Sequence, residues 1–203
     1  RRDPMDYSTL EARRRDSEAE VRLNRRLAPR AYLGVRPLTL EADGQFALGG
    51  SGDVVDWLVE MRRLDRSRML DVVLATGHVT ADDLHRVAAL LASFYAREPA
   101  AVAEGAALQA RLLAQVSANH RVLATLDGEA AGELRSMQAE FLEAQRALLD
   151  ARAAAGCIVE AHGDLRPEHI LLDDPPAVID CLEFDRNLRI MDRAEELELL
   201  VLD

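Results

Sequence analysis

The chain has 203 residues, 49% of them apolar, which is enough to build the core of one large domain or two small ones. Its net charge of −11 argues against nucleic-acid binding and suits a soluble protein, while an acidic face would attract a cationic substrate. No apolar run is long enough to span a membrane, and the charged N-terminus does not resemble a signal peptide.

The two cysteines, Cys157 and Cys181, both lie in apolar, strand-like segments. Two cysteines are too few for a disulfide framework, so we expect reduced thiols and a cytoplasmic location. Given the negative net charge and the absence of a membrane-spanning run, we expect neither a nucleic acid nor a membrane among the partners.

The first sixty residues predict a helix followed by antiparallel strands. Ser8 and Glu11 fit a capping box that opens a highly charged helix, which Ala28-Pro29 ends. Alternating apolar residues then predict strands over 33–40 and 54–61, and we expect two or three antiparallel strands in this part. The glycine-rich sequence at 49–52 predicts a hairpin turn and not a phosphate-binding loop, because neither a helix nor a lysine follows it.

From about residue 66, apolar residues recur every three or four positions, which predicts helices that pack as a bundle. Thr80 fits the cap of one of them, with Val87 and Leu91 on its apolar face. The helices are expected over 66–75, 80–95, 100–126, 129–155 and 193–202. Short apolar segments at 157–159, 170–172 and 177–179 predict strands of one small sheet.

The most informative segment runs from His162 to Asp180. His162-Gly163-Asp164 follows an apolar strand-like run, and Asp180 follows a second one. This order places one carboxylate on a loop, where it can orient a hydroxyl, and another where it can hold the metal that bridges phosphates. The layout is typical of phosphoryl transfer.

This segment resembles the catalytic centre of the aminoglycoside phosphotransferase and choline kinase-like family, whose pattern is His-Gly-Asp, an Asn five residues after that Asp, and then Ile-Asp. The chain matches the His, the Gly and both Asp residues, and carries His169 at the Asn position. The resemblance implies an α+β, protein kinase-like two-lobe fold. Residues 1–62 would form an incomplete small lobe on the nucleotide side. Residues 63–203 would form a mostly helical large lobe with the catalytic loop, truncated at its C-terminal end.

The resemblance also implies a kinase that uses ATP (or GTP) and Mg²⁺ to phosphorylate a hydroxyl of a small molecule. Asp164 would orient that hydroxyl, His162 would brace the catalytic loop, and Asp180 would hold the metal against the phosphates. His169 would be a second metal ligand, with a softer donor atom than the amide oxygen it replaces. The longer run Asp-Leu-Arg-Pro-Glu-His resembles a bacterial branch with some members fused to a P-loop ATPase, so a fused or adjacent domain of that kind is a candidate partner.

Two glutamates outside this segment are candidates for supporting roles. Glu20 resembles the helix glutamate that pairs with the phosphate-binding lysine of kinases, although most of its charged helix is expected to be solvated. Glu196 resembles the acidic residue that braces the catalytic loop, and its more ordinary role would be that of a solvated helix charge.

All 25 basic residues are arginine, so this sequence lacks the strand lysine that contacts the phosphates in such kinases. No glycine-rich phosphate loop precedes the first helix either. We therefore expect the chain to be a fragment that begins after both elements, inactive by itself and weak in ATP binding.

Two other classes of function stay open. His162, Asp164, His169 and Asp180 could together hold Zn²⁺ or Fe²⁺ in a hydrolase. A kinase-like fold without turnover would instead be a binding module, which the missing lysine favours. The acceptor itself could be an aminoglycoside, choline, a sugar or another hydroxyl compound.

Overall fold

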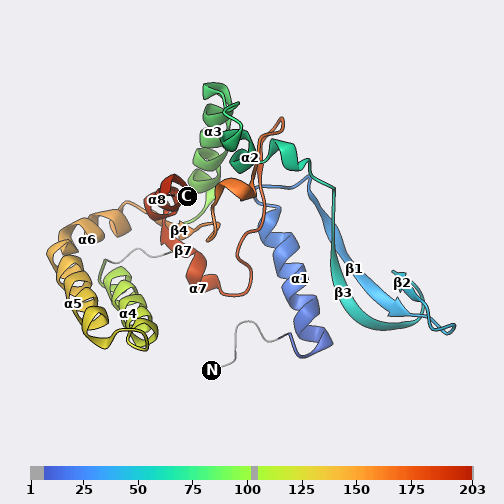
Figure 1. The fold of residues 1–203 in the computed structure, drawn as a ribbon, viewed down its shortest axis with the longest axis horizontal. Coiled ribbons are helices and arrows are strands. Elements are labelled where there is room, and N and C mark those ends of the chain that lie inside the picture. Colours follow the sequence, from blue (N-terminus) through green and yellow to red (C-terminus); the bar gives the residue numbers. More distant parts are fainter. Residues whose placement is uncertain (1–6, 102–104, 203) are drawn as a thin grey trace.

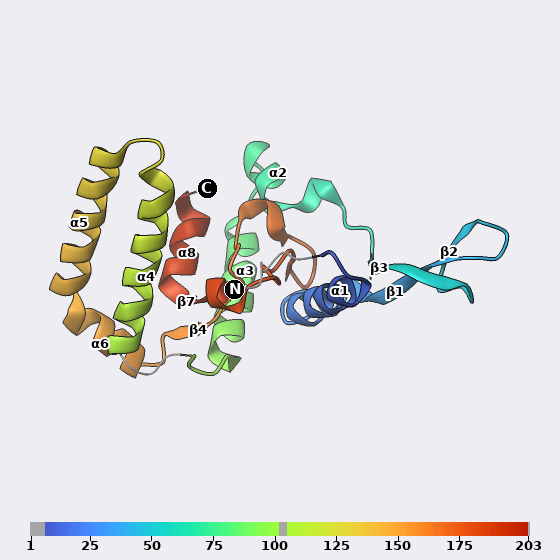
Figure 2. The same ribbon diagram turned by 90° about the horizontal axis from the view of Figure 1, so that it is seen from below.

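The computed structural model describes residues 7–101 and 105–202, and its fold is α+β, with small antiparallel sheets among a majority of helices. Figure 1 shows the sheet of β1, β2 and β3 on one side of the molecule and the helices α4, α5 and α6 on the other. Seen from below, the molecule is extended, with α3, α8 and the short strands between these two ends (Figure 2). No helix of the described residues is long and apolar enough to cross a membrane.

The N-terminal part consists of one helix packed beside a three-stranded sheet in the order β2-β1-β3. Its elements are α1 (Leu10–Asn24), β1 (Tyr32–Leu40), β2 (Phe46–Leu48) and β3 (Asp53–Met61). The two strands expected over 33–40 and 54–61 are confirmed, and β2 is a third strand, whose number the expectation allowed but whose position it did not give. The capping box expected from Ser8 is wrong by one residue: Thr9 has the extended backbone of a cap, and its side chain accepts a hydrogen bond from the N–H of Ala12.

Among the helices of the remainder, the expected ones are confirmed in order but not in every boundary, whereas the short helix over 186–189 was not expected. They are α2 (Leu70–Ala75), α3 (Ala81–Arg97), α4 (Gly105–Leu123), α5 (Gly128–Ala144), α6 (Arg146–Ala154), α7 (Arg186–Arg189) and α8 (Arg193–Leu202), with one 3₁₀ turn at Arg66–Arg68 and another at Pro167–His169. The expected helix over 66–75 is that first turn followed by α2. The expected helix over 129–155 is two helices, because the backbone of Gln145 leaves the helical region. Residues 102–104 of the expected helix over 100–126 lie outside the described residues.

The short strands form two separate pairs where one small sheet was expected. Strand β4 (Ile158–Glu160) pairs with β7 (Ile190–Asp192), and β5 (Ile170–Leu171) pairs with β6 (Ala177–Val178), both antiparallel. The expectation was wrong because β7, which the sequence pattern did not reveal, takes the place beside β4. The two pairs bracket the loops that carry His162 and Asp180.

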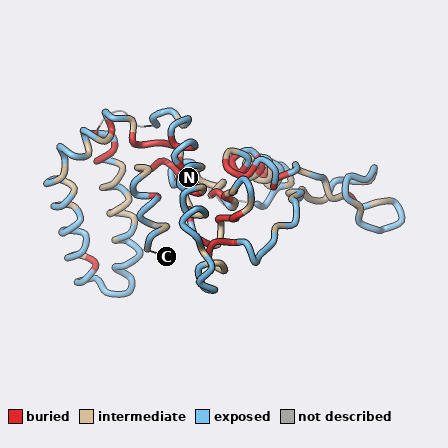
Figure 3. Tube along the Cα trace, turned by 90° about the horizontal axis from the view of Figure 1, so that it is seen from above, coloured by how far each residue is buried: buried red, intermediate tan, exposed pale blue. Residues whose placement is uncertain are grey.

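The core lies at the junction of these elements. Buried residues concentrate at the middle of the molecule, whereas the outer parts of the sheet and of the helical hairpin are mostly exposed or intermediate (Figure 3). The central cluster joins the apolar face of α3 to the loops and short strands of the site; its members include Val87, Leu91, Phe94, Val159, Leu165, Ile170 and Val178. A second cluster joins α1 to β1 and to the β5–β6 pair. The apolar contacts therefore hold the loops that carry His162 and Asp180 at the centre of the molecule.

We predict that shortening a side chain in this central cluster destabilises the fold. Leu91 is 3% exposed, so Leu91→Ala should lower the free energy of unfolding by about 2–5 kcal/mol through lost burial and the cavity left behind. Leu126 is 82% exposed, and Leu126→Ala should change it by less than about 0.5 kcal/mol. Urea denaturation of the two variants measures the difference, and equal effects would mean that α3 does not pack as described.

Candidate functional site

The loop after β4 is held in place by a buried carboxylate. Glu196, on α8, is fully buried, and its Oε1 accepts hydrogen bonds from the backbone N–H groups of His162 (2.8 Å) and Gly163 (2.6 Å). Its Oε2 accepts from the hydroxyl of Tyr95 on α3, at 2.5 Å. Burial raises the pKa of Glu196, and the three hydrogen bonds oppose that rise. The bracing role suggested by resemblance thus matches the contacts of Glu196, and a solvated charge does not.

His162 connects this loop to the one that carries Asp180. Its Nε2 lies 2.9 Å from the carbonyl oxygen of Ile179, which can only accept, so Nε2 carries the proton and donates it. Its Nδ1 accepts from the N–H of Asp164, at 3.4 Å. Burial lowers the pKa of His162 to about 3, so the ring is neutral. Because both nitrogens are engaged inside the protein, His162 is a positioning residue and is not free to bind a metal.

Gly163 is the residue type that this turn requires. Its φ is +90°, and a Cβ atom at this position would lie 2.9 Å from the Cγ of Arg189. Arg189 is itself buried and donates to the carbonyl oxygens of Leu182 (2.7 Å) and Glu183 (3.2 Å). The close approach of these two segments fixes the loop that precedes Asp164 against the loop that follows Asp180.

Three of the residues singled out in the sequence come together as one cluster. Asp164, His169 and Asp180 each offer one potential ligand atom, and these atoms lie within 4.8 Å of one another. The His169 ring is mostly buried, whereas the Asp180 side chain is 67% exposed, so the cluster opens toward solvent. The 3₁₀ turn Pro167–His169 places His169 on the chain just before β5, and Asp180 follows β6.

The tautomer of His169 follows from its hydrogen bond. Nδ1 lies 2.8 Å from the carbonyl oxygen of Asp164 and therefore donates to it. In the neutral ring, Nε2 then presents a lone pair, and it lies 3.2 Å from Oδ2 of Asp180. Two acceptors this close repel each other unless a proton or a cation lies between them.

These residues fit a divalent cation. Neighbouring ligands of an octahedral ion with bonds of about 2.1 Å are about 3.0 Å apart, close to the separation of His169 Nε2 and Asp180 Oδ2. Two carboxylates supply the hard oxygens that Mg²⁺ prefers, and the imidazole adds a softer donor.

Asp180 is also held from the N-terminal part of the chain. Its φ is +64°, and its N–H donates to the hydroxyl of Tyr32 at 3.2 Å. The next N–H, of Cys181, donates to Oδ1 of Asn24, at the end of α1, at 2.8 Å. Burial raises the pKa of Tyr32 to about 12, so the phenol stays protonated. These two contacts set the direction of the Asp180 side chain.

Glu20 lies on α1 close enough to the cluster to interact with it. Burial raises the pKa of Glu20, and the negative charges of Glu183 and Asp180 raise it further. Within residues 7–101 and 105–202, no cationic side chain forms an ion pair with Glu20. The Glu20 side chain is thus only partly exposed to solvent, and the site has an excess of negative charge.

Four residues that position the site were not singled out in the sequence. Asn24 and Tyr32 hold the segment at Asp180, and Arg189 holds the one after it. Arg26 donates to the carbonyl oxygens of Glu160 (2.8 Å) and Ala161 (2.9 Å), just before His162. The sequence contains only a weak sign of these roles. Asn24 lies between the apolar residues Leu23 and Leu27, which is the pattern expected for a buried polar residue.

Comparisons with known proteins give relatives but no described function. The chain is 32% identical to an uncharacterized protein of Mycobacterium bovis and to uncharacterized proteins of two strains of Mycobacterium tuberculosis, each over 211 aligned positions. The alignment covers 99% of this chain, which spans only about 40% of the length of these curated relatives. No family model matches the chain, and no solved structure matches it significantly.

We predict that Glu196 contributes far more to the free energy of unfolding than an exposed glutamate of the same helix does. Glu196→Ala leaves two backbone N–H groups and the Tyr95 hydroxyl without their acceptor, so it should lower the free energy of unfolding by at least about 2 kcal/mol. Glu198→Ala, at an exposed position of the same helix, should change it by less than about 0.5 kcal/mol. Urea denaturation compares the two, and a small effect at Glu196 would contradict the bracing role.

Proposed function

We propose that this chain carries the acceptor and metal side of a phosphotransferase site, which moves the γ-phosphate of ATP or GTP to a hydroxyl of a small molecule. The observation that carries the proposal is the cluster of Asp164, His169 and Asp180 on two loops braced by Glu196 and His162. An exposed carboxylate lies beside a pair of groups suited to a divalent cation, which is the combination phosphoryl transfer needs.

The arrangement of the chain supports a kinase-like two-lobe interpretation. Helix α1 and the sheet of β1, β2 and β3 correspond to the expected small lobe of residues 1–62, and the helices from α2 onward to the large lobe of residues 63–203. The segment of Asp180 and Cys181 contacts the N-terminal part through Asn24, at the end of α1, and Tyr32, at the start of β1. A nucleotide bound beside these contacts would have its phosphates near both carboxylates.

The chemistry assigned to each residue comes from the family resemblance, and the contacts described above are compatible with it. Asp164 accepts the proton of the acceptor hydroxyl while the oxygen attacks the γ-phosphorus, and the bond from the γ-phosphorus to the β–γ bridging oxygen breaks to release the diphosphate. Asp180 and His169 would hold Mg²⁺, which supplies positive charge to the phosphate oxygens when bound. His162 links the Asp164 loop to the Asp180 loop through its two ring nitrogens and does not contact the reactants.

The electrostatics of the site favour cationic ligands. Glu20, Asp180 and Glu183 lie near one another, and burial together with mutual repulsion raises the pKa of Glu20 and of Glu183. Such a site lowers its own electrostatic energy by binding a cation, whether a metal ion or an ammonium group of an acceptor. The four-ligand hydrolase alternative is less well supported, because both nitrogens of His162 are already engaged.

We predict that Asp164→Asn lowers turnover about 10²- to 10⁴-fold, because the amide cannot accept the hydroxyl proton. Turnover should be measured in the full-length native protein that carries residues 1–203, with Mg-ATP and a panel of hydroxyl acceptors. Asp53→Asn, an exposed carboxylate at the start of β3, serves as the matched control and should keep parental turnover. Metal and nucleotide binding without turnover by the parent would instead support the binding-module alternative.

We further predict that Asp180 and His169 determine metal affinity and preference. Asp180→Ala should weaken Mn²⁺ binding to the 203-residue chain about tenfold or more, as followed by electron paramagnetic resonance, whereas Asp53→Ala should leave it unchanged. His169→Asn should keep or raise Mg²⁺-dependent activity in the native protein, because it restores an oxygen ligand, and His169→Ala should reduce it.

The protein with His169 should also have a higher ratio of Mn²⁺-dependent to Mg²⁺-dependent activity than the His169→Asn variant, because imidazole is the softer ligand. Titration of activity against Mg²⁺ and Mn²⁺ separates this role from simple packing. Identical metal profiles for the parent and both His169 variants would remove His169 from the metal shell.

A further inference from the structure

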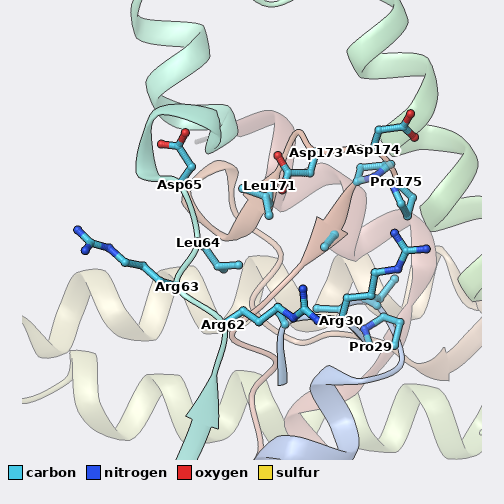
Figure 4. A pocket seen from close by; sticks show the side chains of 15 residues that line it. Pro29, Arg30, Arg62, Arg63, Leu64, Asp65, Leu171, Asp173, Asp174 and Pro175 are labelled. Atoms are coloured by element: carbon cyan, nitrogen blue, oxygen red, sulfur yellow. The ribbon is translucent and has the colours of Figure 1, made fainter. Parts of the chain in front are cut away.

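A pocket of about 410 Å³ lies away from the Asp164–His169–Asp180 cluster, and none of these three residues lines it. Its walls come from three segments: the connection from α1 to β1, the connection from β3 to the first 3₁₀ turn, and the turn between β5 and β6 (Figure 4). Much of the lining is apolar, from Leu27, Ala28, Pro29, Ala31, Leu64, Leu171, Pro175, Pro176 and Ala177. Its volume is that of a site for a small organic molecule.

The lining holds three arginines and three aspartates, and most of its unpaired charges belong to arginine. In the described part of the chain, the side chains of Arg30, Arg62 and Arg63 form no hydrogen bond or ion pair. Two carboxylates of the lining are already engaged: Asp173 pairs with Arg68 at 2.5 Å, and Asp65 accepts hydrogen bonds from Ser67. In a protein of net charge −11, a pocket with unpaired guanidinium groups is a local exception.

Two of these arginines are placed to act together. Figure 4 shows the Arg62 and Arg30 side chains extending along one side of the pocket, while Arg63 points away and the Asp174 carboxylate lies on the opposite side. The guanidinium group binds carboxylates and phosphates through paired N–H donors, and it is less strongly hydrated than an ammonium group. A ligand with an anionic head could reach both groups while its body rests on the apolar wall.

We propose that this pocket binds a small organic anion, with a phosphate or carboxylate head on an apolar body. An inorganic ion would leave the apolar wall exposed to water, and a neutral molecule would leave both guanidinium groups unpaired. The combination of the two surfaces therefore selects an amphipathic anion over either part alone.

The pocket shares two chain segments with the Asp164–His169–Asp180 cluster, so a ligand bound in the pocket could influence the cluster. Leu171 is two residues after His169, and Ala177 is three residues before Asp180, so the β5–β6 turn joins pocket and cluster. The opposite wall begins at Leu27, three residues after Asn24, which holds the segment at Asp180. A bound anion would tie the end of α1 to the β5–β6 turn.

The test uses the 203-residue chain in EDTA without nucleotide, so that it does not depend on the metal site or on any transfer activity. Calorimetry with phenyl phosphate and benzoate should give saturable binding by at least one of the two, and the stronger identifies the preferred head. Phenol and inorganic phosphate, which each present only half of the ligand, should bind about tenfold more weakly or worse.

The matched variants decide whether this binding occurs in the pocket. Replacing both arginines, Arg30→Gln with Arg62→Gln, should weaken the preferred anion about tenfold or more. Arg121→Gln, an exposed arginine at the end of α4, should change its affinity less than twofold. Because both pocket arginines are exposed, the double variant should keep the parental circular dichroism spectrum and melting temperature. Failure of both anions to bind, or equal binding by parent and double variant, would overturn the proposal.

Discussion

The buried carboxylate of Glu196 is the contact on which the arrangement of the site depends. Removing a carboxylate from water is costly unless hydrogen bonds replace the lost solvation, and three donors surround this one. Two of them are consecutive backbone N–H groups of the His162 loop, and the third is a hydroxyl on α3. One side chain thereby fixes the loop against two helices. The position of Asp164 follows from that loop, so a contact made by Glu196 outside the Asp164–His169–Asp180 cluster determines where the Asp164 carboxylate lies.

His162 extends this constraint from the first loop to the second. Its ring makes hydrogen bonds with both the N–H of Asp164 and the carbonyl oxygen of Ile179, so it links the two loops directly. The N-terminal part adds a third constraint, through Tyr32 and Asn24 at the backbone of Asp180 and Cys181. The negative charges of Asp180, Glu183 and Glu20 can therefore stay close to one another, since the backbone hydrogen bonds prevent the loops from separating under their repulsion. Acidic groups held this close together repel one another less when a cation lies among them.

In this extended molecule, the buried residues lie at the centre, around the loops that carry His162 and Asp180. The sheet of β1, β2 and β3 and the helical hairpin of α4 and α5 expose much of their surface, including Phe46 on one end and Phe141 on the other. Apolar burial is concentrated at the middle, where the clusters around α3 and α1 meet the short strands. The β5–β6 pair belongs to both clusters and separates the anionic site from the arginine-lined pocket. The acidic cluster and the pocket lined by Arg30 and Arg62 thus share one small element of structure.

Local patterns in the sequence were sufficient for features that depend on neighbouring residues. The cap at Thr80, the helical periodicity around Leu91 and the strands near 33–40 and 54–61 reflect preferences within one element, and the spacing from His162 to Asp180 already brought the cluster residues to attention. Only the tertiary structure decided that Asn24 holds Cys181 across 157 positions, that Tyr32 holds Asp180 across 148, and that β7 pairs with β4. It also decided that Glu196 is buried and that Arg30 and Arg62 line a pocket. Hydrogen bonds and burial between distant segments depend on how those segments meet, and a single sequence has no local periodicity that records it.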